Sequence, residues 1–342
     1  MRKQVRTLAL VVLAVGLLAL FLRGAHLSEV WAEIKQADAW LVGIAVSSTV
    51  VNMAFRAIRW QYLLKPVGPT RFRSVFRATM IGFAALNVLP ARAGEVIKPY
   101  LLARTEGLSV TATFATVVLE RVLDSVTVVT LLASFVLFFD PGMAAADSTM
   151  YRLVRIGGIA VGSGALVLLG VLFFAAGHPE ALGRWAFKLE HLLPGHMTHK
   201  LGALLQSFAE GLAIVRSPMR LFVALIWSFP VWFAIALGVW TASLAFHIVM
   251  PFTGSFLLLA LLVVGVSVPT PGGVGAFEAA YRIGATSFYA VPNDRAVGAA
   301  LVLHAISIVP TVALGFLFLV QDGLNLGGVR KLATAAVEGD AP

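Results

Sequence analysis

The chain has 342 residues, of which 59% are hydrophobic and 13% are charged, against roughly a quarter charged in a soluble domain. It has no cysteine, which excludes disulfides, cysteine-ligated metal centres and thiol catalysis. The formal net charge is +9, but the basic residues gather in alternate loops, which is typical of the positive-inside rule and not of nucleic-acid binding. The composition therefore predicts an all-α polytopic membrane protein.

Six apolar segments are long enough to cross a bilayer as helices. They cover residues 7–23, 39–60, 111–139, 154–176, 221–247 and 296–320. The first follows Arg2, Lys3 and Arg6, as in a signal peptide, but no small-residue cleavage site comes after it, so we expect an uncleaved helix. Two further apolar segments, 72–108 and 254–290, are broken by proline and glycine, and we predict that each is a re-entrant helical hairpin. The alternative is two full spans in place of each hairpin, which gives eight or more spans.

The distribution of basic residues predicts the orientation. With the N-terminus in the cytoplasm and both hairpins re-entrant, 19 of the 26 Lys and Arg residues are cytoplasmic and 6 lie outside. We therefore expect a bacterial-type inner (plasma) membrane protein with both termini in the cytoplasm. Residues 179–220 mix aromatic, leucine and basic residues, which predicts an interfacial amphipathic segment on the cytoplasmic side. We expect residues 321–342 to form a flexible tail.

The order of span, broken segment and span occurs twice, in residues 39–139 and in residues 221–320. Corresponding spans start 182 and 185 positions apart, and the first copy begins outside whereas the second begins inside. This spacing predicts two inverted half-repeats within a single membrane domain, residues 1–342. In transporters of this design, interruptions at corresponding positions of the two halves mark the binding site near the bilayer midplane.

The first interruption reads Asn87-Val-Leu-Pro-Ala-Arg-Ala-Gly-Glu95-Val-Ile-Lys98. Its proline ends one helix and its glycine lets the next one begin, so a helix N-terminus would present free amides to an anion. Arg92 and Lys98 add positive charge that suits a phosphate or carboxylate. We therefore predict that Asn87, Arg92, Glu95 and Lys98 bind substrate. The alternative is a cytoplasmic loop whose basic residues only obey the positive-inside rule.

The second interruption reads Val268-Pro-Thr-Pro-Gly-Gly-Val-Gly-Ala-Phe-Glu278. Gly272, Gly273 and Gly275 supply backbone that a ligand can approach closely, as an anion-binding nest of amides or a cation site of carbonyls. Glu278 follows within apolar sequence, and a carboxylate at membrane depth is a functional candidate. We predict substrate binding by these four residues, with a flexible extracellular turn as the alternative.

Two further groups of charged residues lie within or at the end of predicted spans. Glu120, Arg121 and Asp124 lie within one helical turn, where they are costly unless they pair or face a cavity. Arg56 and Arg59 close the second span, which indicates interface anchors or headgroup contacts. No catalytic nucleophile, nucleotide motif or metal-ligand spacing occurs, so we predict no catalytic residue, no cofactor and no metal site, and a protein that is not an enzyme.

The motifs Arg59-Trp60, Asn87 through Pro90 to Arg92-Ala-Gly-Glu95, Glu120-Arg121 with Asp124, and Pro271-Gly-Gly-Val-Gly-Ala-Phe-Glu278 follow one another along nearly the whole chain. With these motifs the chain resembles the flippase-like membrane family named for the transmembrane part of lysylphosphatidylglycerol synthase. Lys98 stands where the resemblance leads us to expect arginine. The resemblance implies movement of aminoacylated phospholipid between leaflets. The synthase's soluble aminoacyl-transfer domain is not recognised in this sequence, so we expect translocation without synthesis.

The sequence therefore predicts a lipid transporter or flippase for an anionic or aminoacylated phospholipid or another lipid-linked headgroup. Two other classes stay open. One is a membrane enzyme acting on lipid or polyprenyl-phosphate substrates through Glu95, Glu120 and Asp124, and the other is an accessory subunit of a partner synthase. A small-solute carrier is a nearer relative of the main prediction. Homo-oligomerisation stays open, and no nucleic-acid partner is expected.

Overall fold

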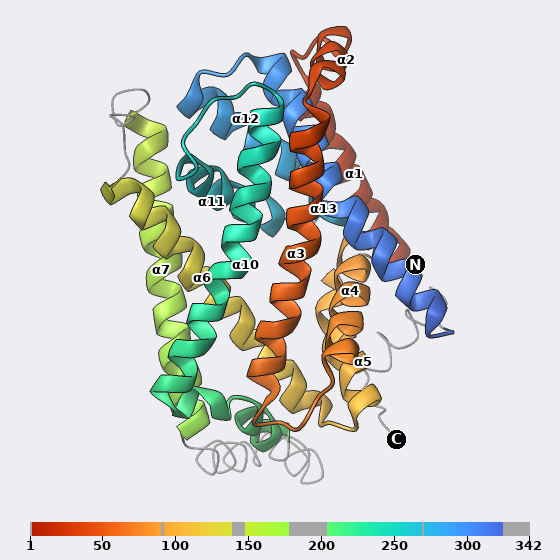
Figure 1. Cartoon of the computed structure of the whole chain (residues 1–342), viewed down its shortest axis with the longest axis vertical. Helices are drawn as coiled ribbons and strands as arrows, with labels where there is room; N and C mark the ends of the chain where they lie inside the picture. The colour runs from red at the N-terminus through yellow and green to blue at the C-terminus, as the bar shows by residue number, and fades with distance from the viewer. Residues whose placement is uncertain (1, 90–91, 139–147, 178–203, 269, 324–342) are drawn as a thin grey trace.

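The computed structural model describes residues 2–89, 92–138, 148–177, 204–268 and 270–323, and this part of the chain is helical without a strand (Figure 1). The long helices are α1 (Arg2–Leu22), α3 (Ala39–Leu64), α6 (Val110–Phe138), α7 (Ser148–Gly177), α10 (Pro218–Ala245) and α13 (Asn293–Gln321). The shorter elements are α2 (Leu27–Gln36), α4 (Phe72–Val88), α5 (Gly94–Glu106), η3 (Ala213–Arg216), α11 (Gly254–Ser267), η4 (Pro271–Gly273) and α12 (Ala276–Tyr289).

Each of the six predicted spans coincides with a long helix. By length and composition, four described helices could cross a membrane: α3, residues 152–171 of α7, α10 and α13. A fifth span results if α1 and α2, which are bent by 83° at their break, count together. The described chain therefore has four to five candidate spans. The prediction of an all-α membrane protein is confirmed.

The side chains at helix starts explain two of these boundaries. Asp38 accepts hydrogen bonds from the backbone amides of Trp40 and Leu41, which caps the N-terminus of α3. Ser217 caps α10 in the same way and Pro218 occupies its first turn, where a proline has no amide to leave unpaired.

Much of α7 exposes apolar side chains, including Ile156, Ile159, Leu166, Val167 and Phe173, as expected for a surface that faces lipid.

Both predicted interruptions are real breaks between helices that pack against each other. The break between α4 and α5 follows Leu89, and the break between α11 and α12 contains η4. A Cβ added at Gly94 would lie 2.1 Å from the carbonyl oxygen of Gly82, and one added at Gly265 would lie 2.7 Å from that of Ala276. Glycine at these positions therefore lets the two arms of each hairpin approach backbone to backbone. Pro90 and Pro269 lie outside the described residues.

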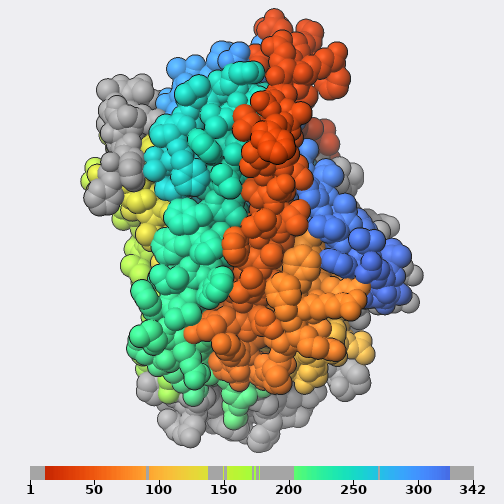
Figure 2. Space-filling model, viewed as in Figure 1, coloured from red at the N-terminus to blue at the C-terminus, as the bar shows by residue number. Residues whose placement is uncertain are grey.

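The helix α3 packs along α10 in the centre of the molecule (Figure 1). Figure 2 shows the same face, where α3 lies between α10 on one side and α4 with α13 on the other. Towards the α4–α5 end, Trp60, Leu63 and Leu212 belong to one buried apolar cluster. Towards the α2–α12 end, Phe246 and Tyr281 belong to another. These clusters hold the long helices together on both sides of the two breaks.

Two predicted segments lie partly outside the described residues. Of the interfacial segment 179–220, residues 179–203 are not described, and of the tail 321–342, residues 324–342 are not. The described end of the interfacial segment is packed inside the protein, because Ala209, Leu212 and Val215 are fully buried. A Cβ at Gly211 would lie 2.2 Å from the carbonyl oxygen of Ala112 in α6. This part of the segment is therefore docked on the helix bundle.

Candidate functional site

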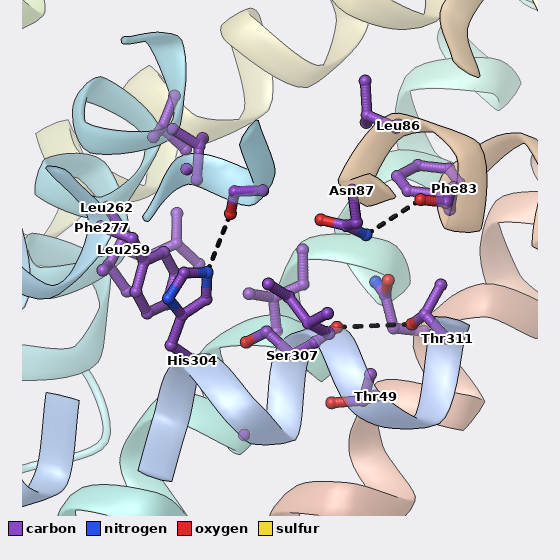
Figure 3. A pocket seen from close by; sticks show the side chains of 18 of the residues that line it. Thr49, Phe83, Leu86, Asn87, Leu259, Leu262, Phe277, His304, Ser307 and Thr311 are labelled. Carbon is purple, nitrogen blue, oxygen red and sulfur yellow. Dashed lines mark hydrogen bonds between the residues drawn. The ribbon is translucent and has the colours of Figure 1, made fainter. Parts of the chain in front are cut away.

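A cavity of about 420 Å³ lies where the two breaks meet. Its walls come from α3, α4, α6, α10, α11, α12 and α13 together with η4. Figure 3 shows Phe83 and Asn87 of α4 on one side and His304 and Ser307 of α13 on the other. Of the residues predicted to bind substrate, four line the cavity: Asn87, Arg92, Gly272 and Gly273. The cavity thus joins two stretches of sequence that are almost two hundred positions apart.

The tips of the two hairpins are in contact. Arg92 in the first break donates a hydrogen bond of 3.4 Å from Nη1 to the carbonyl oxygen of Val266 at the end of α11. A Cβ at Gly272 in the second break would lie 3.3 Å from the carbonyl oxygen of Asn87. Gly272 has a φ of 63° and Gly273 a φ of 77°, the left-handed region that favours glycine. The glycines therefore serve the turn and the close approach of the two tips.

Arg92 is held in an unusual backbone conformation. Its φ is 54°, which costs roughly 1–2 kcal/mol for a residue with a side chain. Its guanidinium donates from Nε and Nη2 to Oε1 of Glu95, at 3.1 and 2.9 Å. Arg92 therefore lines the cavity with a charge that Glu95 already balances. Glu95 itself does not line the cavity.

A buried ionic cluster connects α3, α5 and α6. We define it as Arg56, Arg59, Lys98, Glu120, Arg121 and Asp124. Lys98 Nζ lies 2.5 Å from Oε2 of Glu120 and 4.0 Å from the ring centroid of Trp60, and Lys98 is only 3% exposed. Lys98 does not line the cavity. Lys98 was predicted to bind substrate, and the structure places it inside the protein, where it pairs with Glu120.

Arg59, predicted as an interface anchor or headgroup contact, lies between helices of the bundle. Its side chain is completely buried and donates from Nη1 to Oδ1 of Asp124 at 2.7 Å and to the hydroxyl of Ser228 at 2.9 Å. Its Nη2 lies 3.5 Å from Oε1 of Glu120. A buried arginine requires such partners because desolvating its charge is costly. Arg59 is a structural ion-pair residue that binds α3 to α6.

The cavity side of the ionic cluster carries surplus positive charge. Arg56, Arg121 and Asp124 line the cavity, and both arginines lie 3.5 Å from the same Oδ2 atom of Asp124. The other oxygen of Asp124 accepts from the Trp232 indole at 3.0 Å. The whole cluster contains four cations and two carboxylates, and Lys98 and Arg59 already serve the deeper contacts. The uncompensated charge therefore lies on Arg56 and Arg121, beside the cavity.

Several buried polar atoms at this wall have no hydrogen-bond partner among the described residues. They are Nη1 of Arg56, Nε of Arg121, Oδ2 of Asp124 and Oγ1 of Thr270, of which the Arg56 and Asp124 atoms face each other only as an ion pair at 3.5 Å. A buried donor or acceptor without a partner costs about 1–3 kcal/mol. The remaining cavity wall is mostly apolar, with side chains such as Phe83, Leu259 and Leu262. The arrangement therefore suits a ligand that has a polar, anionic part and an apolar part.

Glu278 and His304 form a second buried pair. Oε2 of Glu278 accepts from the backbone amide of Gly275 at 2.8 Å, which caps α12. Its Oε1 lies 2.7 Å from Nδ1 of His304, and Nε2 of His304 lies 2.9 Å from the carbonyl oxygen of Gly272. The His304 ring stacks on Phe277 with centroids 4.4 Å apart. Glu278 is thus a capping and pairing residue that reaches the cavity through His304.

The cavity wall includes His304 and Trp232, which the sequence did not single out, and Arg56, which was predicted as an interface anchor or headgroup contact. For His304 the sequence held a signal, because a histidine within an apolar span is a functional candidate by default. Gly275, in contrast, was predicted to bind substrate but does not line the cavity. A Cβ there would lie 2.5 Å from Cβ of Leu17. Gly275 therefore allows α1 to approach the start of α12.

The model of the family described as Lysylphosphatidylglycerol synthase TM region matches residues 7–315 of the chain. The chain belongs to this family. The resemblance predicted from the motifs is thereby confirmed, and the chain is an integral membrane protein. Glycosyltransferase AglD of Haloferax volcanii is 26% identical over 344 residues, which cover 90% of this chain and 52% of the relative. The UPF0104 membrane protein MJ1595 of Methanocaldococcus jannaschii is 33% identical over 70 residues, 20% of this chain and 21% of the relative.

This family member spans only about half the length of AglD. The glycosyltransferase activity in the name of AglD therefore describes that whole protein.

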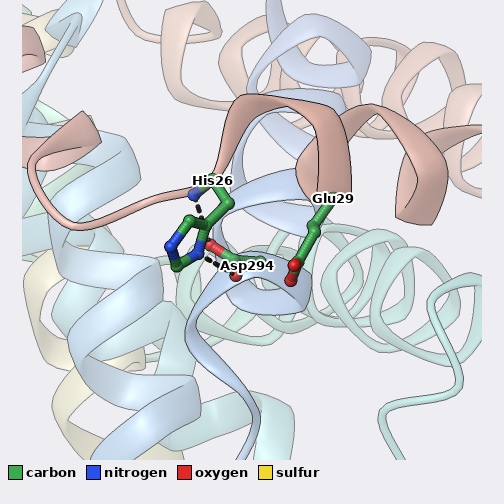
Figure 4. A group of neighbouring side chains, drawn as sticks. All are labelled: His26, Glu29 and Asp294. Atoms are coloured by element: carbon green, nitrogen blue, oxygen red, sulfur yellow. Dashed lines mark hydrogen bonds and ion pairs between the residues drawn. The ribbon is translucent and has the colours of Figure 1, made fainter.

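A third polar group lies at the surface, away from the cavity. His26 Nδ1 lies 3.2 Å from Oδ2 of Asp294, and the backbone amide of His26 donates to Oδ1 at 2.9 Å (Figure 4). Glu29 brings a second carboxylate, and the three ligand atoms lie within 4.8 Å of one another. The hydrogen bond to Asp294 raises the pKa of His26 above its usual value. These contacts attach the turn between α1 and α2 to the start of α13, and the predicted absence of a metal site stays a prediction.

Proposed function

We propose that this chain moves a phospholipid or another lipid-linked polar headgroup between the leaflets of its membrane. The observation that carries the proposal is the cavity where the two breaks meet. It combines an arginine-rich polar wall, in which buried donors lack partners, with apolar side chains along the rest of its surface. An amphipathic ligand would satisfy both kinds of surface at once.

The charge of the wall favours an anionic headgroup. Arg56 and Arg121 share one carboxylate, that of Asp124, so a phosphate near them would gain charge-assisted hydrogen bonds. Without such a cavity, an unpaired polar group pays several kcal/mol to enter hydrocarbon. Lys98 pairs with Glu120, and Glu95 pairs with Arg92. The phosphate contacts are therefore proposed for Arg56 and Arg121.

The proposed arrangement in the membrane follows from the sequence. The two hairpins enter from opposite sides as parts of an inverted repeat, and the basic residues put both termini in the cytoplasm. Contact between the tips, through Arg92 and Gly272, supports a site shared by both halves. Membership of the Lysylphosphatidylglycerol synthase TM region family supports a lipid substrate.

A second candidate function is glycosyl transfer to a lipid acceptor. The observation in its favour is the relative named Glycosyltransferase AglD, which aligns with 90% of this chain. Purified protein incubated with sugar nucleotides and lipid extracts distinguishes the two functions. A lipid whose mass increases by one sugar would establish transfer, whereas translocation leaves every lipid mass unchanged.

The test of the main proposal is lipid exchange in liposomes reconstituted with the purified chain. Labelled anionic, aminoacylated, zwitterionic and uncharged lipids are compared in the wild type, in Arg121→Gln and in Arg71→Gln. Arg71 is the matched control, because it is exposed and forms its ion pair with Glu106. Loss of one charge-assisted hydrogen bond, about 1.5–3 kcal/mol, predicts exchange of the anionic lipid that is at least about tenfold slower in Arg121→Gln. Wild-type protein that exchanges no lipid, or equal exchange in all three proteins, would refute the proposal.

A further inference from the structure

The contacts of His304 determine where its protons lie. A backbone carbonyl can only accept a hydrogen bond, so Nε2, which lies 2.9 Å from the carbonyl oxygen of Gly272, must carry a hydrogen. The other nitrogen, Nδ1, lies 2.7 Å from Oε1 of Glu278. An unprotonated Nδ1 and a carboxylate oxygen are both acceptors and repel at this distance. A proton must therefore lie between them, on one partner or the other.

From this geometry we propose that Glu278 and His304 together bind one exchangeable proton and that this proton is coupled to lipid movement, an inference that rests on the proposed function. With the proton bound, the pair has no net charge, as carboxylate with imidazolium or as carboxylic acid with imidazole. Without it, the pair carries one negative charge. Glu278 and His304 are only 3% and 6% exposed, so both states lie in surroundings where a change of one charge is costly.

The proton site borders the cavity, which also contains other charged groups. His304 lines the cavity, and Glu278, which does not, contacts Nδ1 of His304. The charged groups that share the cavity are Arg56, Arg92, Arg121 and Asp124, of which Arg92 is balanced by Glu95. Along α13 and the helices packed against it, further ion pairs lie near its ends: Arg77 pairs with Asp322, Glu33 with Arg295 and His26 with Asp294. On α12, Arg282 donates to the carbonyl of Phe21.

Arg56 and Arg121 offer an anionic headgroup its contacts in the same cavity that His304 lines. A negatively charged pair and an anionic headgroup would repel each other across this cavity, so the bound proton favours headgroup binding and, by reciprocity, the headgroup favours the bound proton. The proton and the anionic lipid are therefore expected to bind and leave together.

Loss of the proton also breaks a mechanical contact. The one hydrogen left on the ring lies either on Nε2, where Nδ1 then repels Glu278, or on Nδ1, where Nε2 then repels the carbonyl of Gly272. In either case one of the two links between α13 and the tip of the second hairpin is lost. Gly272 lies directly against Asn87 of the first hairpin. The proton thus controls the joint at which both tips meet, which makes this joint a candidate for the gate.

The first test measures the proton site without transport. Nitrogen NMR of histidine-labelled protein in micelles resolves the ring of His304, assigned through His304→Gln. We expect a ring that is protonated at Nε2 and hydrogen-bonded at Nδ1, and a pH dependence of the ring nitrogens that differs in Glu278→Gln, because a neutral amide cannot share the proton as a carboxylate does. A ring with the same titration in Glu278→Gln would overturn the shared-proton assignment.

The second test measures coupling in the same liposomes under an imposed pH difference. For one proton per lipid, a tenfold proton ratio across the membrane should drive up to a tenfold unequal distribution of the anionic lipid, because the two free energies are equal. In Glu278→Gln the lipid distribution should not respond to the gradient. The control Glu33→Gln removes a carboxylate that pairs with Arg295 and should respond like the wild type.

The outcomes separate the two proposals. Wild-type exchange that is independent of the pH difference refutes coupling and leaves lipid translocation standing. Wild-type protein without any lipid exchange refutes the proposed function and with it the coupling, and the NMR titration then decides the proton site alone.

Discussion

Replacement of Glu120 by glutamine tests the deepest contact of the ionic cluster. The substitution keeps the shape of the side chain and removes the charge that lies 2.5 Å from Lys98 Nζ and 3.5 Å from Arg59 Nη2. Lys98 is 3% exposed and Arg59 is fully buried, so neither cation can turn to water. Removal of one partner from a buried ion pair typically costs about 3–5 kcal/mol. We expect a loss of this size in the free energy of unfolding of Glu120→Gln.

The assay is equilibrium unfolding in mixed micelles of mild detergent and SDS, followed by circular dichroism. The double variant Lys98→Met/Glu120→Leu should recover much of the loss, because apolar side chains of similar volume replace a buried ion pair at little cost. The double variant should also exchange lipid, since Arg56 and Arg121 remain. A Glu120→Gln protein as stable as the wild type, or a stable double variant without lipid exchange, would refute the reasoning and return Lys98 to the substrate site.

Two further predictions concern packing and pH. Gly94→Ala places a methyl group 2.1 Å from a backbone carbonyl of α4, so thermal unfolding should show a loss of about 1–3 kcal/mol in stability. Gly164→Ala, with nothing within 4 Å of the new methyl group, should not be less stable than the wild type. Equal losses in the two variants would contradict the tight hairpin. The raised pKa of His26 means that its link to Asp294 stabilises the turn between α1 and α2 fully below the unfolded value near 6.5 and is lost as the pH rises through the folded value. Hydrogen exchange in this turn, corrected for its intrinsic pH dependence, should therefore accelerate over that window in the wild type and stay constant in His26→Gln, and a turn that opens on acidification would reverse the assigned sign.

The long helices and the two breaks could be predicted from the sequence because their signals are local. An apolar run of sufficient length specifies a helix at α3, α10 and α13, and proline with glycine specifies where α4 and α11 end. The capping of α12 was not identified as a local feature, although Glu278 lies three residues after Gly275 and its carboxylate reaches back to that amide. A carboxylate in apolar sequence indicates a ligand group, and the carboxylate of Glu278 also caps α12.

The pairing of charges could not be predicted because it joins residues that are distant in sequence. Lys98 pairs with Glu120, 22 positions further along the sequence, and Arg59 pairs with Asp124, 65 positions further along. Periodicity within one helix suggests only local partners, such as Arg121 with Asp124. Arg59 also lies at the end of an apolar run, where snorkelling to the interface is the ordinary expectation. Its burial follows from the packing of α3 between α6 and α10, which no local pattern encodes.

The order of the ionic cluster from inside to outside bears on selectivity. At its inner side, Lys98 and Arg59 meet Glu120 and one oxygen of Asp124, so charge is balanced there. At the cavity side, two arginines meet only the remaining oxygen of Asp124. With one carboxylate for two arginines the wall stays positively charged, and only a second carboxylate there would make it neutral and favour zwitterionic or uncharged headgroups. Because Glu120 lies on the inner side with Lys98 and Arg59, an anion can complete a site that the protein leaves one partner short.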